Sequence, residues 1–370
     1  MSISFPDSLK ADGSRRRAVV GMSGGVDSAV TAFLLLRAGF DVTGVTLRMF
    51  QEGPGNEKRM EEIRAAADSA ERLGIPFITE DCAEDFRKNV SEPFVREYLA
   101  ARTPNPCVEC NRAVKWSGLM RAADRAGADL VATGHYAHVI QLPNGRYTIK
   151  QADQAAKDQT YVLFRLTQEQ LAKTFMPLGS YDKAEVRKIA EEAGLAVARK
   201  ADSQEICFIT DGHYADYIEN EMKGAVPGPG NFVDAEGKIL GTHKGITHYT
   251  VGQRKGLGLP LGYHAYVTKI RPETNEVVLG RDGDQYKDRV LCDRLNFMSI
   301  EDIAPGEEIP AAVRIRYHHA GEPAILTRTG EDRLMIRFEK PVRAAAPGQS
   351  AVFYDEKGCI IGGGRILGSE

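Results

Sequence analysis

Short apolar runs alternate with amphipathic stretches from Arg17 to about Ala201. In the amphipathic stretches the apolar residues recur every three or four positions, which is the period of a helix with one buried face. Alternation at this spacing is typical of a parallel sheet covered by helices, so we predict an α/β doubly wound parallel sheet. The expected strands are 18–20, 42–47, 76–79 and 130–133, and the expected helices are 29–38, 57–73, 83–100, 112–126 and 183–193.

The second half of the chain has a different pattern. A Pro143-Asn144-Gly145 turn between two apolar runs already predicts a β-hairpin. After Cys207, Pro and Gly residues at 227–230 are followed by short strands separated by Gly turns, with almost no helix from about Val290 onward. We therefore expect two small β domains after the α/β domain, the last a β-barrel. The predicted domains are 1–210, 211–285 and 286–370, and the expected strands of the central one are 231–233, 238–240, 263–270 and 276–279.

Length and charge limit the number of domains and the location of the chain, but they do not identify its partner. A chain of 370 residues is too long for one core, and no apolar run approaches the roughly 20 residues that span a bilayer. The basic Arg15–Arg17 run precedes an apolar stretch that is broken at Ser23, so a secretory signal is not expected and a cytoplasmic location is predicted.

Residues 102–125 carry five Lys or Arg against two acids, and residues 311–350 carry seven against four. Solvated surfaces account for such excesses nearly as well as nucleic acid does, and the net charge is −3.

The turn after the first apolar run carries the clearest chemistry. It reads Gly21, Met22, Ser23, Gly24, Gly25, Val26, Asp27 and Ser28, and a helical pattern follows at once. A glycine turn at a helix N-terminus brings free N–H groups and a favourable dipole to a phosphate. No Gly-Lys-Ser/Thr follows, and the dinucleotide Gly-x-Gly-x-x-Gly pattern is absent from the turn. The turn resembles the pyrophosphate loop of ATP pyrophosphatases, which cleave ATP to AMP and pyrophosphate while adenylating a substrate oxygen. The alternative is an ordinary strand-to-helix turn.

Six cysteines in a cytoplasmic chain are expected to be thiols. Cys82, Cys292 and Cys359 stand in apolar or mixed contexts and are predicted to be structural. The other three, Cys107, Cys110 and Cys207, stand beside polar or turn-forming residues and are expected to line loops.

Cys107 and Cys110 follow a stiff Pro104-Asn105-Pro106 segment, and the expected helix begins after Cys110. A thiol at a helix N-terminus has a lowered pKa and is reactive. A Cys-x-x-Cys pair also fits half a zinc site, a dithiol redox pair or coincidence, and the chain has no second pair for a four-cysteine zinc site. Cys207 taken alone would most often be a small buried apolar residue.

Segments along the whole chain match one family. They are 21–28, Ala-Thr-Gly-His-Tyr at 132–136, Lys-Asp-Gln at 157–159, 203–208, Pro-Gly-Pro-Gly at 227–230, 252–258 and Pro-Gly-Gln at 347–349. Together they resemble the MnmA family of tRNA-specific 2-thiouridylases, which convert the wobble uridine of tRNA to 2-thiouridine. The resemblance implies an adenine nucleotide alpha hydrolase-like (PP-loop) domain followed by two β domains, with ATP and Mg²⁺ as cofactors.

By position, the resemblance places the family's nucleophilic cysteine on Cys110 and its persulfide cysteine on Cys207. It implies that the 23–28 loop holds ATP while the uracil 2-oxygen attacks the α-phosphate, with Asp27 helping to hold Mg²⁺. Cys207 would then receive a sulfane sulfur from a donor protein. Cys110 would attack the inner sulfur and release the terminal one toward the base, leaving a Cys110–Cys207 disulfide that a reductant opens. Alternatively, the persulfide attacks the base first.

Cys107 departs from the family pattern, because many members carry an aspartate at this position. A thiol of ordinary pKa about 8.5 is mostly neutral where an aspartate of about 3.9 is charged. Cys107 is thus an acid/base, a resolving thiol that recycles Cys110, or a replacement showing that the acid/base role is dispensable. A further alternative is that Cys107, Cys110 and Cys207 bind three irons of a 4Fe-4S cluster whose open iron carries sulfide.

The resemblance also implies binding residues outside the loop and the cysteines. Gly134 is placed near the adenine or ribose, Leu47 against the adenine, and His135 at the nucleotide and tRNA. A structural histidine, a core leucine and solvated surface charges are the alternative interpretations. The residues implied to contact tRNA are Asn105, His135, Lys157, Asp158, Gln159, Arg316, Tyr317 and Gln349. Lys and Arg would hold phosphates, while Asn105 and Gln349 would bond exposed bases.

The expected partners are tRNA (the acceptors for Glu, Gln and Lys) and a persulfide sulfur-donor protein. No association with a membrane is expected, and the chain is predicted to be a monomer. Two other functions compete with this one. An ATP-dependent synthetase with a small-molecule acceptor would need neither Cys110 nor Cys207. A non-catalytic binding module or a simple sulfur relay would tolerate a degenerate phosphate loop, whereas Ser23, Asp27 and Ser28 are all present.

Overall fold

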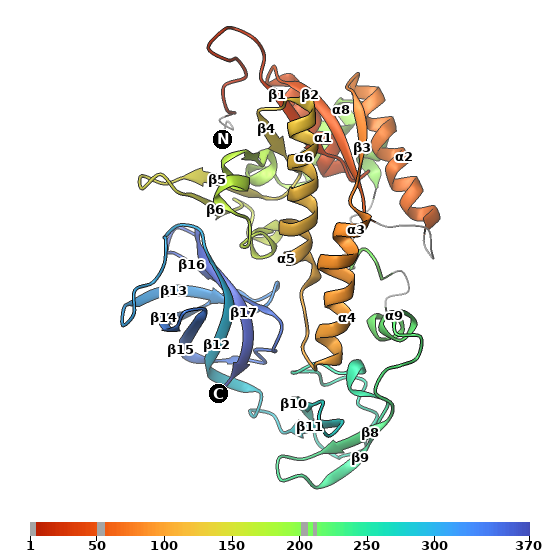
Figure 1. Cartoon of the computed structure of the whole chain (residues 1–370), viewed down its shortest axis with the longest axis vertical. Helices are drawn as coiled ribbons and strands as arrows, with labels where there is room; N and C mark the ends of the chain where they lie inside the picture. The colour runs from red at the N-terminus through yellow and green to blue at the C-terminus, as the bar shows by residue number, and fades with distance from the viewer. Residues whose placement is uncertain (1–4, 50–55, 201–205, 210–212) are drawn as a thin grey trace. The chain divides into compact units, whose positions relative to one another are not determined.

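The computed structural model describes residues 5–49, 56–200, 206–209 and 213–370 (Figure 1). The chain forms two compact units. Unit 1 comprises Met1–Val90, Cys107–Thr210 and Lys357–Ile360, and unit 2 comprises Ser91–Pro106, Asp211–Glu356 and Ile361–Glu370. Within the described ranges, each helix is too short or too polar to cross a lipid bilayer.

Unit 1 is built on a five-stranded parallel sheet with the strand order β3-β2-β1-β4-β7. Its central strand β1 pairs with β2 from Arg17 opposite Asp41, and with β4 from Ala18 opposite Leu130. The sheet confirms the predicted parallel core, and it adds the short strand β7, which the sequence pattern did not indicate. The strands are β1 (Arg17–Gly21), β2 (Asp41–Arg48), β3 (Phe77–Asp81), β4 (Leu130–Ala132) and β7 (Thr174–Phe175).

Helices cover both faces of this sheet, as the doubly wound prediction requires. Side chains alternate across a strand, so Val20 packs with residues of α1 and α2, while Val19 packs with residues of α6. Helix α8 packs against α1 through Val186 and Ala190. These helices are α1 (Val26–Arg37), α2 (Asn56–Leu73), α6 (Ser117–Ala126) and α8 (Lys183–Glu192).

Two expected helices are interrupted by π-helical turns. The segment expected at 83–100 consists of α3 (Ala83–Phe86), the π turn η1 (Arg87–Ser91) and α4 (Glu92–Leu99). The helix expected to begin after Cys110 instead begins at Pro106, so the prediction was wrong by about one turn. It runs through α5 (Pro106–Cys110) and the π turn η2 (Asn111–Trp116) into α6. Proline suits the first helical position because the N–H it lacks would be unpaired there.

The predicted hairpin is confirmed as β5 (Ala137–Gln141) and β6 (Tyr147–Gln151). A later part of the chain joins it, because Gln151 donates its backbone N–H to Gly358 O at 2.9 Å and Thr148 Oγ1 donates to Ile360 O at 2.6 Å. The remaining elements of unit 1 are η3 (Ala155–Lys157), η4 (Thr160–Val162), α7 (Gln168–Ala172), η5 (Pro177–Ser180) and η6 (Ala196–Arg199).

Unit 2 contains a four-stranded sheet with the order β10-β11-β8-β9. Phe232 and Val267 are fully buried in its core. Helix α4 packs on α9, with the rings of Tyr98 and Tyr214 stacked at 4.6 Å; α9 was not indicated by the sequence pattern. The elements here are α9 (Tyr214–Glu221), β8 (Gly230–Val233), β9 (Ile239–His243), η7 (Ile246–His248), β10 (Tyr266–Arg271) and β11 (Glu276–Gly280).

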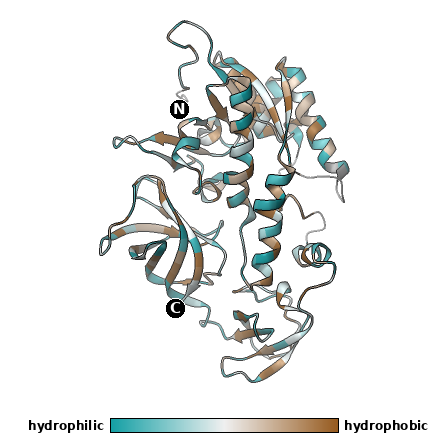
Figure 2. Ribbon diagram, viewed as in Figure 1, coloured by the Kyte–Doolittle hydropathy of each residue, from teal (hydrophilic) through white to brown (hydrophobic). Residues whose placement is uncertain are grey.

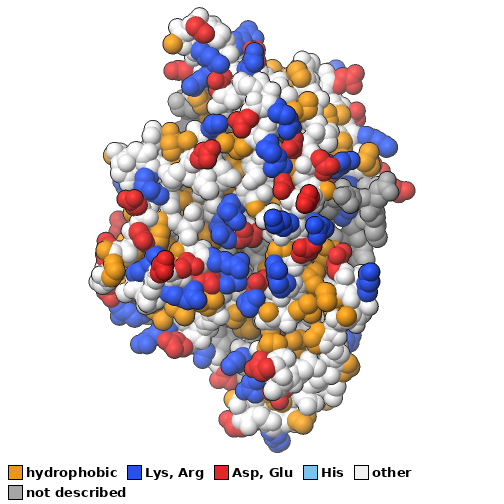
Figure 3. All heavy atoms as spheres, viewed as in Figure 1, with side chains coloured by type: hydrophobic (Ala, Val, Ile, Leu, Met, Phe, Trp, Pro, Cys, Tyr) orange, Lys and Arg blue, Asp and Glu red, His pale blue; other side chains and the backbone are white. Residues whose placement is uncertain are grey.

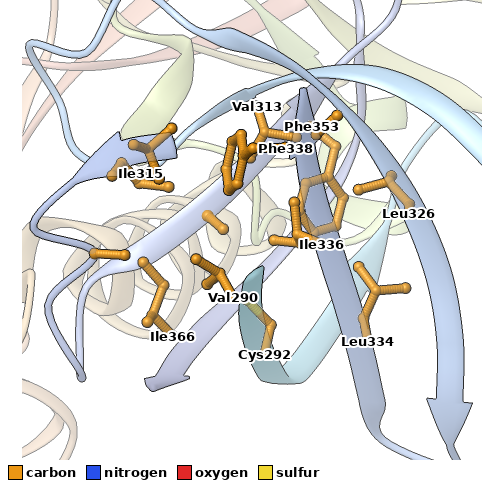
Figure 4. Close-up of a cluster of buried hydrophobic side chains, with 14 of the residues drawn as sticks. Val290, Cys292, Val313, Ile315, Leu326, Leu334, Ile336, Phe338, Phe353 and Ile366 are labelled. Atoms are coloured by element: carbon orange, nitrogen blue, oxygen red, sulfur yellow. The ribbon is translucent and has the colours of Figure 1, made fainter. Parts of the chain in front are cut away.

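The predicted β-barrel is confirmed as a closed barrel in the order β12-β15-β14-β13-β16-β17. Buried residues alternate with more exposed ones over the first part of β15, residues 333–338. Figure 2 shows hydrophobic and hydrophilic residues interspersed along the strands of the barrel. Leu326, Ile336 and Phe353 are among the side chains that fill its interior (Figure 4). The strands are β12 (Tyr286–Phe297), β13 (Glu308–Arg314), β14 (Glu322–Gly330), β15 (Arg333–Arg343), β16 (Ser350–Tyr354) and β17 (Ile360–Ser369).

Candidate functional site

The loop between β1 and α1 lies at the carboxyl edge of the parallel sheet, where ligands of such folds bind. Met22 donates its N–H to Val45 O at 2.8 Å and accepts a bond from Thr46 Oγ1 at 2.6 Å, which fixes the start of the loop to β2. Gly24 has a φ of +73°, and a Cβ there would lie 2.1 Å from Glu62 O of α2. Both facts require glycine at this position.

The loop leads into a helix N-terminus suited to an anion. Gly25 is the N-cap of α1, and no side chain among the described residues caps it. Ser23 donates its N–H to Ser28 Oγ at 3.2 Å, and Ser28 Oγ donates to Gly25 O at 3.0 Å. These bonds hold the loop open around the first turn of a helix twelve residues long, where the N–H groups and the dipole favour a phosphate.

Asp27 is already paired. Lys183 Nζ lies 2.8 Å from each carboxylate oxygen of Asp27, and Tyr136 donates its hydroxyl to Asp27 Oδ1 at 2.7 Å. A second lysine, Lys200, donates to Gly24 O at 2.9 Å. Sequence reasoning missed both lysines. The Asp182–Glu185 capping box marks the start of α8 just before Lys183, but nothing in it indicates which side chain Lys183 meets.

Gly134 and His135 follow β4 at the same sheet edge. A Cβ on Gly134 would lie 2.8 Å from the backbone of Asp27, so the strand end packs directly on α1. His135 Nδ1 bonds Thr133 Oγ1 at 2.9 Å, and its ring lies 5.4 Å from that of Trp116. Burial, helped by the nearby Lys115, lowers the pKa of His135 to about 3, so the imidazole is neutral. Leu47 is partly buried and packs with the core between the sheet and α6.

The three candidate thiols differ in exposure. Cys107 and Cys207 are exposed, whereas Cys110 is buried with 5% of its surface exposed. Cys110 is the last residue of α5, and its Sγ lies 4.0 Å from Met49 Sδ. Its burial raises the pKa of the Cys110 thiol to about 12, which corrects the expectation of a thiol activated at a helix N-terminus. Neither Cys107 nor Cys110 lies on a loop, whereas Cys207 does lie in a turn.

The three thiols lie within electrostatic range of one another. Negative charge on Cys107 or Cys207 raises the pKa of Cys110 further. Desolvation raises the pKa of Cys207 although its side chain reaches solvent, because surrounding protein displaces much of the water around it. Within the described ranges, no three His, Cys, Asp or Glu side chains are arranged to hold a metal ion. The other three cysteines are buried, as predicted for structural residues.

Lys115 is a further residue that sequence reasoning missed. It is half-buried, and its ammonium charge lowers the pKa of Cys110 and of Cys207. The π turn η2 begins directly after Cys110 and contains Lys115. The sequence pattern indicates a regular helix here and does not show the π turn, so nothing in it pointed to Lys115.

Asp158 and Gln159, like His135, are predicted to contact tRNA but are held by bonds within unit 1. Asp158 is buried and accepts bonds from Ala152 N at 3.3 Å and Thr160 Oγ1 at 2.8 Å. Gln159 exchanges bonds with the backbone of Tyr136, at 3.0 and 3.1 Å. Lys157, at the end of η3, is half-buried. The segment 201–205, which carries Ser203 of the matching 203–208 motif, lies outside the described residues.

In unit 2 the barrel holds the segment that precedes α5. Gln349 Nε2 donates to Thr103 O at 2.8 Å, and Thr103 donates its N–H to Pro347 O at 2.7 Å. Gly348 has a φ of +91°, and a Cβ there would lie 2.8 Å from Thr103 N. The Pro-Gly-Gln motif thus positions the extended segment that carries Asn105. Arg316 and Tyr317 are exposed on the barrel.

Charge alone does not mark a nucleic-acid surface. On the face shown in Figure 3, Lys and Arg side chains are interspersed with Asp and Glu. The case for RNA therefore depends on particular residues and on relatives of the chain.

Three family models match the chain in succession. They are the tRNA methyl transferase HUP domain at residues 16–211, the tRNA methyl transferase PRC-barrel domain at 215–281 and the Aminomethyltransferase beta-barrel domain at 287–366.

Curated relatives match nearly the whole chain. The tRNA-specific 2-thiouridylase MnmA of Lachnoclostridium phytofermentans is 49% identical over 361 residues, which is 95% of this chain and 99% of that protein. The protein of the same name from Clostridium botulinum strain Alaska E43 is 44% identical, covering 95% and 98%. Among solved structures, the U34-tRNA thiolase NcsA from Methanococcus maripaludis with its [4Fe-4S] cluster has 20% identity and a TM-score of 0.35, covering 59% of this chain and 71% of that one. A similarity that low supports no inference about the site.

Proposed function

Because the chain belongs to the family of tRNA-specific 2-thiouridylases, we propose that it uses ATP to adenylate the 2-oxygen of a tRNA wobble uridine and then replaces that oxygen with sulfur. One observation carries the proposal beyond the family name. The unit that contains the phosphate loop also contains three thiols within electrostatic range of one another. A synthetase that joins small molecules needs the loop but not the thiols.

The adenylation step uses the loop residues 21–28, with Gly134 and Leu47 beside the nucleotide. The N–H groups at the start of α1 bind the pyrophosphate part of ATP, and the uracil 2-oxygen attacks the α-phosphate. Pyrophosphate leaves, and the 2-oxygen becomes a good leaving group as AMP. Lys183 neutralises Asp27 at rest.

Asp27 is also the residue that would hold Mg²⁺, because carboxylate oxygens are the ligands this cation prefers. Both of its oxygens are engaged by Lys183, so binding the metal requires Lys183 to move aside or to share the carboxylate. The metal would supply charge neutralisation at the phosphate oxygens.

The sulfur step uses Cys207 and Cys110. A donor protein transfers a sulfane sulfur to Cys207, giving Cys–S–SH. The Cys110 thiolate attacks the inner sulfur, forms the Cys110–Cys207 disulfide and expels hydrosulfide, which attacks C2 of the uridine and displaces AMP. A dithiol reductant then restores both thiols. In the alternative order the persulfide attacks C2 first and Cys110 cleaves the resulting S–S bond. Either order requires the two sulfurs to come within bonding distance.

Cys107 is exposed one helical turn before Cys110. Its position leaves the three roles named from the sequence: acid/base, resolving thiol, or neither. The second candidate mechanism, a 4Fe-4S cluster on Cys107, Cys110 and Cys207, is not favoured by the arrangement of the described residues, which presents no three-ligand group.

We further propose that tRNA is bound by the predicted residues of both units, with the acceptors for Glu, Gln and Lys as substrates. Exposed Arg316 and Tyr317 suit a phosphate and a stacked base. Asp158 and Gln159 act by shaping the turn that carries Lys157. The chain acts as a cytoplasmic monomer of three domains, 1–210, 211–285 and 286–370, supplied by a persulfide donor.

The test is anaerobic thiolation of an unmodified wobble-uridine tRNA with ATP, Mg²⁺ and a persulfide donor. We expect 2-thiouridine from the wild type and from a Cys359→Ala control, and none from Cys110→Ser or Cys207→Ser. Activity that survives in both serine variants would overturn the persulfide mechanism. Activity that appears only after iron and sulfide are restored would favour the cluster. Retained activity in Cys107→Ser would show that this thiol is auxiliary.

A further inference from the structure

Helix α5 carries a charged residue directly before Cys110. Among the five residues of α5, Glu109 is the one with a charged side chain. Its carboxylate pairs through Oε1 with Arg165 Nη1, and its Oε2 lies 3.4 Å from Arg112 Nη2. Arg165 lies between η4 and α7, so the Glu109–Arg165 ion pair fastens α5 to another part of unit 1.

The elements on either side of that arginine, η4 and α7, hold the turn that follows α5. Asn111 is buried and donates Nδ2 to Val162 O at 3.0 Å, and Gln170 donates Nε2 to Arg112 O at 3.1 Å. These bonds fix the start of the π turn η2. Helices bend at π turns, so α5 can swing about η2 while η2 itself stays anchored. The ion pair of Glu109 is a contact that such a swing has to break.

The two sulfurs of the proposed transfer start in different surroundings. Cys110 is buried, whereas Cys207 is exposed in a turn, and both are free thiols. The turn of Cys207 is held in place, because the neighbouring Phe208 is buried with its ring 5.4 Å from that of Phe86 in α3. A disulfide needs its two sulfurs about 2.05 Å apart. The movement that joins them is therefore expected of Cys110, and hence of α5.

We propose that Glu109 is a positioning residue: its ion pair with Arg165 keeps Cys110 away from a persulfide on Cys207 until tRNA is bound. The inference rests on the proposed sulfur transfer. Without this restraint Cys110 would lose its proton to solvent and attack the inner sulfur of the persulfide as soon as the persulfide formed. The Cys110–Cys207 bond would form and the S–SH bond would break. Hydrosulfide would leave with the electron pair of that bond, with no uridine present to receive it.

Arg112 offers a means of releasing the restraint. Its bond to Glu109 is long, and its Nε is buried without a hydrogen-bond partner among the described residues. The side chain is only half-buried, and a guanidinium binds phosphate oxygens through two parallel bonds. A tRNA phosphate that recruits Arg112 or Arg165 would remove positive charge from Glu109 and free α5.

The test measures whether the persulfide is retained without tRNA or ATP. Cys207 of the full-length protein is loaded anaerobically with cysteine persulfide, the excess is removed, and hydrosulfide release is followed. The variants are Glu109→Gln, Arg165→Gln and the two combined. Asp124→Asn is the matched control, because it also turns an acid into an amide and breaks an ion pair of the same unit, with Lys173 at 3.6 Å.

We expect the wild type to retain its persulfide and Glu109→Gln to release hydrosulfide about ten-fold faster, leaving a Cys110–Cys207 disulfide visible in non-reduced peptides. Arg165→Gln should behave in the same way, and the double variant should be no faster than either single one, because the two side chains act as one pair. Asp124→Asn should match the wild type. Release at the wild-type rate from both single variants would overturn the inference, as would additive effects in the double variant.

Addition of unmodified tRNA without ATP should speed hydrosulfide release from the wild type toward the rate of Glu109→Gln, and should change the rate of Glu109→Gln little. An unchanged rate in the wild type would refute the release of α5 by tRNA.

Labelling with iodoacetamide, without persulfide, reports on the fold of each variant. Cys110 should be labelled faster in Glu109→Gln, while Cys82 in unit 1 and Cys292 in unit 2, which are 1% and 0% exposed, should stay unlabelled. If Glu109→Gln exposes Cys82, Arg165→Lys replaces it, because lysine keeps the charge but lacks the planar fork of arginine.

The same measurements separate this inference from the proposed function. Faster labelling of Cys110 in Glu109→Gln, together with a wild type that makes no 2-thiouridine, would support the restraint on Cys110 and refute the thiolation. An active wild type whose labelling and hydrosulfide release do not depend on Glu109 would do the reverse.

Discussion

The phosphate loop and the thiols of unit 1 differ in what acts on their ionisable groups. Asp27 is held by Lys183 and Tyr136. Burial raises the pKa of the Cys110 thiol, which is therefore protonated at neutral pH, and lowers the pKa of His135, whose imidazole is neutral. The loop is therefore organised before its ligand binds, as expected for an electrostatic site whose donors must not reorganise during the reaction. The Cys110 thiol, by contrast, must lose its proton before it can act as a nucleophile. One unit thus contains a loop that is preorganised and a thiol that is not activated.

The largest expected effect is the loss of ATP binding in Gly24→Ala, which should disturb the loop and leave the thiols unchanged. The new Cβ would meet Glu62 O and would occupy a left-handed backbone position, so the loop must distort. We expect ATP binding to weaken by at least about 100-fold, given the cost of lost preorganised donors, while alkylation of the thiols is unchanged. Calorimetric titration of ATP measures the first quantity.

Gly145→Ala is the matched control for that change, because its φ is +82° but no atom lies within 4 Å of the added Cβ. It should cost about 1 kcal/mol of stability from backbone strain and leave ATP binding intact. If Gly24→Ala also bound ATP normally, the loop would not be the nucleotide site.

A smaller effect is expected from Lys183→Met, which removes the cation from Asp27. The carboxylate keeps its bond from Tyr136 but loses two charge-assisted contacts at 2.8 Å. We expect adenylation to slow by about 10- to 100-fold, corresponding to about 1.4 to 2.7 kcal/mol. Pyrophosphate release in the presence of tRNA measures it. Lys188→Met, on the same helix, serves as the control, and equal rates for the two variants would show that the Asp27 pair is only structural.

The neutral histidine at the thiol region predicts a pH dependence of stability. The pKa of His135 is about 3 in the folded chain and about 6.5 when unfolded. The stability it contributes is complete above pH 6.5 and is lost as the pH falls toward 3, because the unfolded chain then binds one more proton. His135→Gln should therefore flatten the decrease of Tm between pH 6.5 and 4. Parallel Tm curves for the wild type and the variant would contradict the prediction.

The smallest expected effect is on stability and thiolation when the contact between the barrel and the segment before α5 is removed. Gln349→Ala removes the bond to Thr103 O and should cost about 1 kcal/mol of stability. Because Thr103 keeps its bond to Pro347, the segment should stay in place and thiolation should fall only a few-fold. Urea unfolding and single-turnover thiolation measure the two effects. A much larger loss of tRNA affinity at unchanged stability would show that Gln349 contacts RNA directly.

The sequence predicted the parallel sheet, the hairpin and the barrel because hydrophobic periodicity and turn residues report directly on buried faces. Each of the confirmed strands β1, β2, β3 and β4 overlaps an apolar run in the sequence. Strand β7, with two residues, is too short to have a period. The division into three domains, 1–210, 211–285 and 286–370, stays a prediction.

The residues of the candidate site could be predicted only where they belong to one continuous sequence motif. The loop residues stand in one uninterrupted segment, so pattern and chemistry coincide there. Lys183 was missed because its contact with Asp27 spans 156 positions of chain. Lys115 was missed because the sequence pattern does not show the π turn in which it lies. The start of α5 was misplaced because Pro106 was interpreted as the end of an extended segment and not as the first residue of a helix. The roles proposed for the site residues stay predictions.

The return of Lys357–Ile360 to the hairpin of unit 1 has a consequence for synthesis. Thr148 and Gln151 bond to Ile360 O and Gly358 O, more than 200 positions later in the chain. A chain that emerges from the ribosome N-terminus first cannot make these bonds until residues 358–360 have been translated. The sheet and its helices can assemble early, but the hairpin edge waits for the last strands of the barrel. Completion of the unit that holds the phosphate loop therefore follows synthesis of most of the barrel.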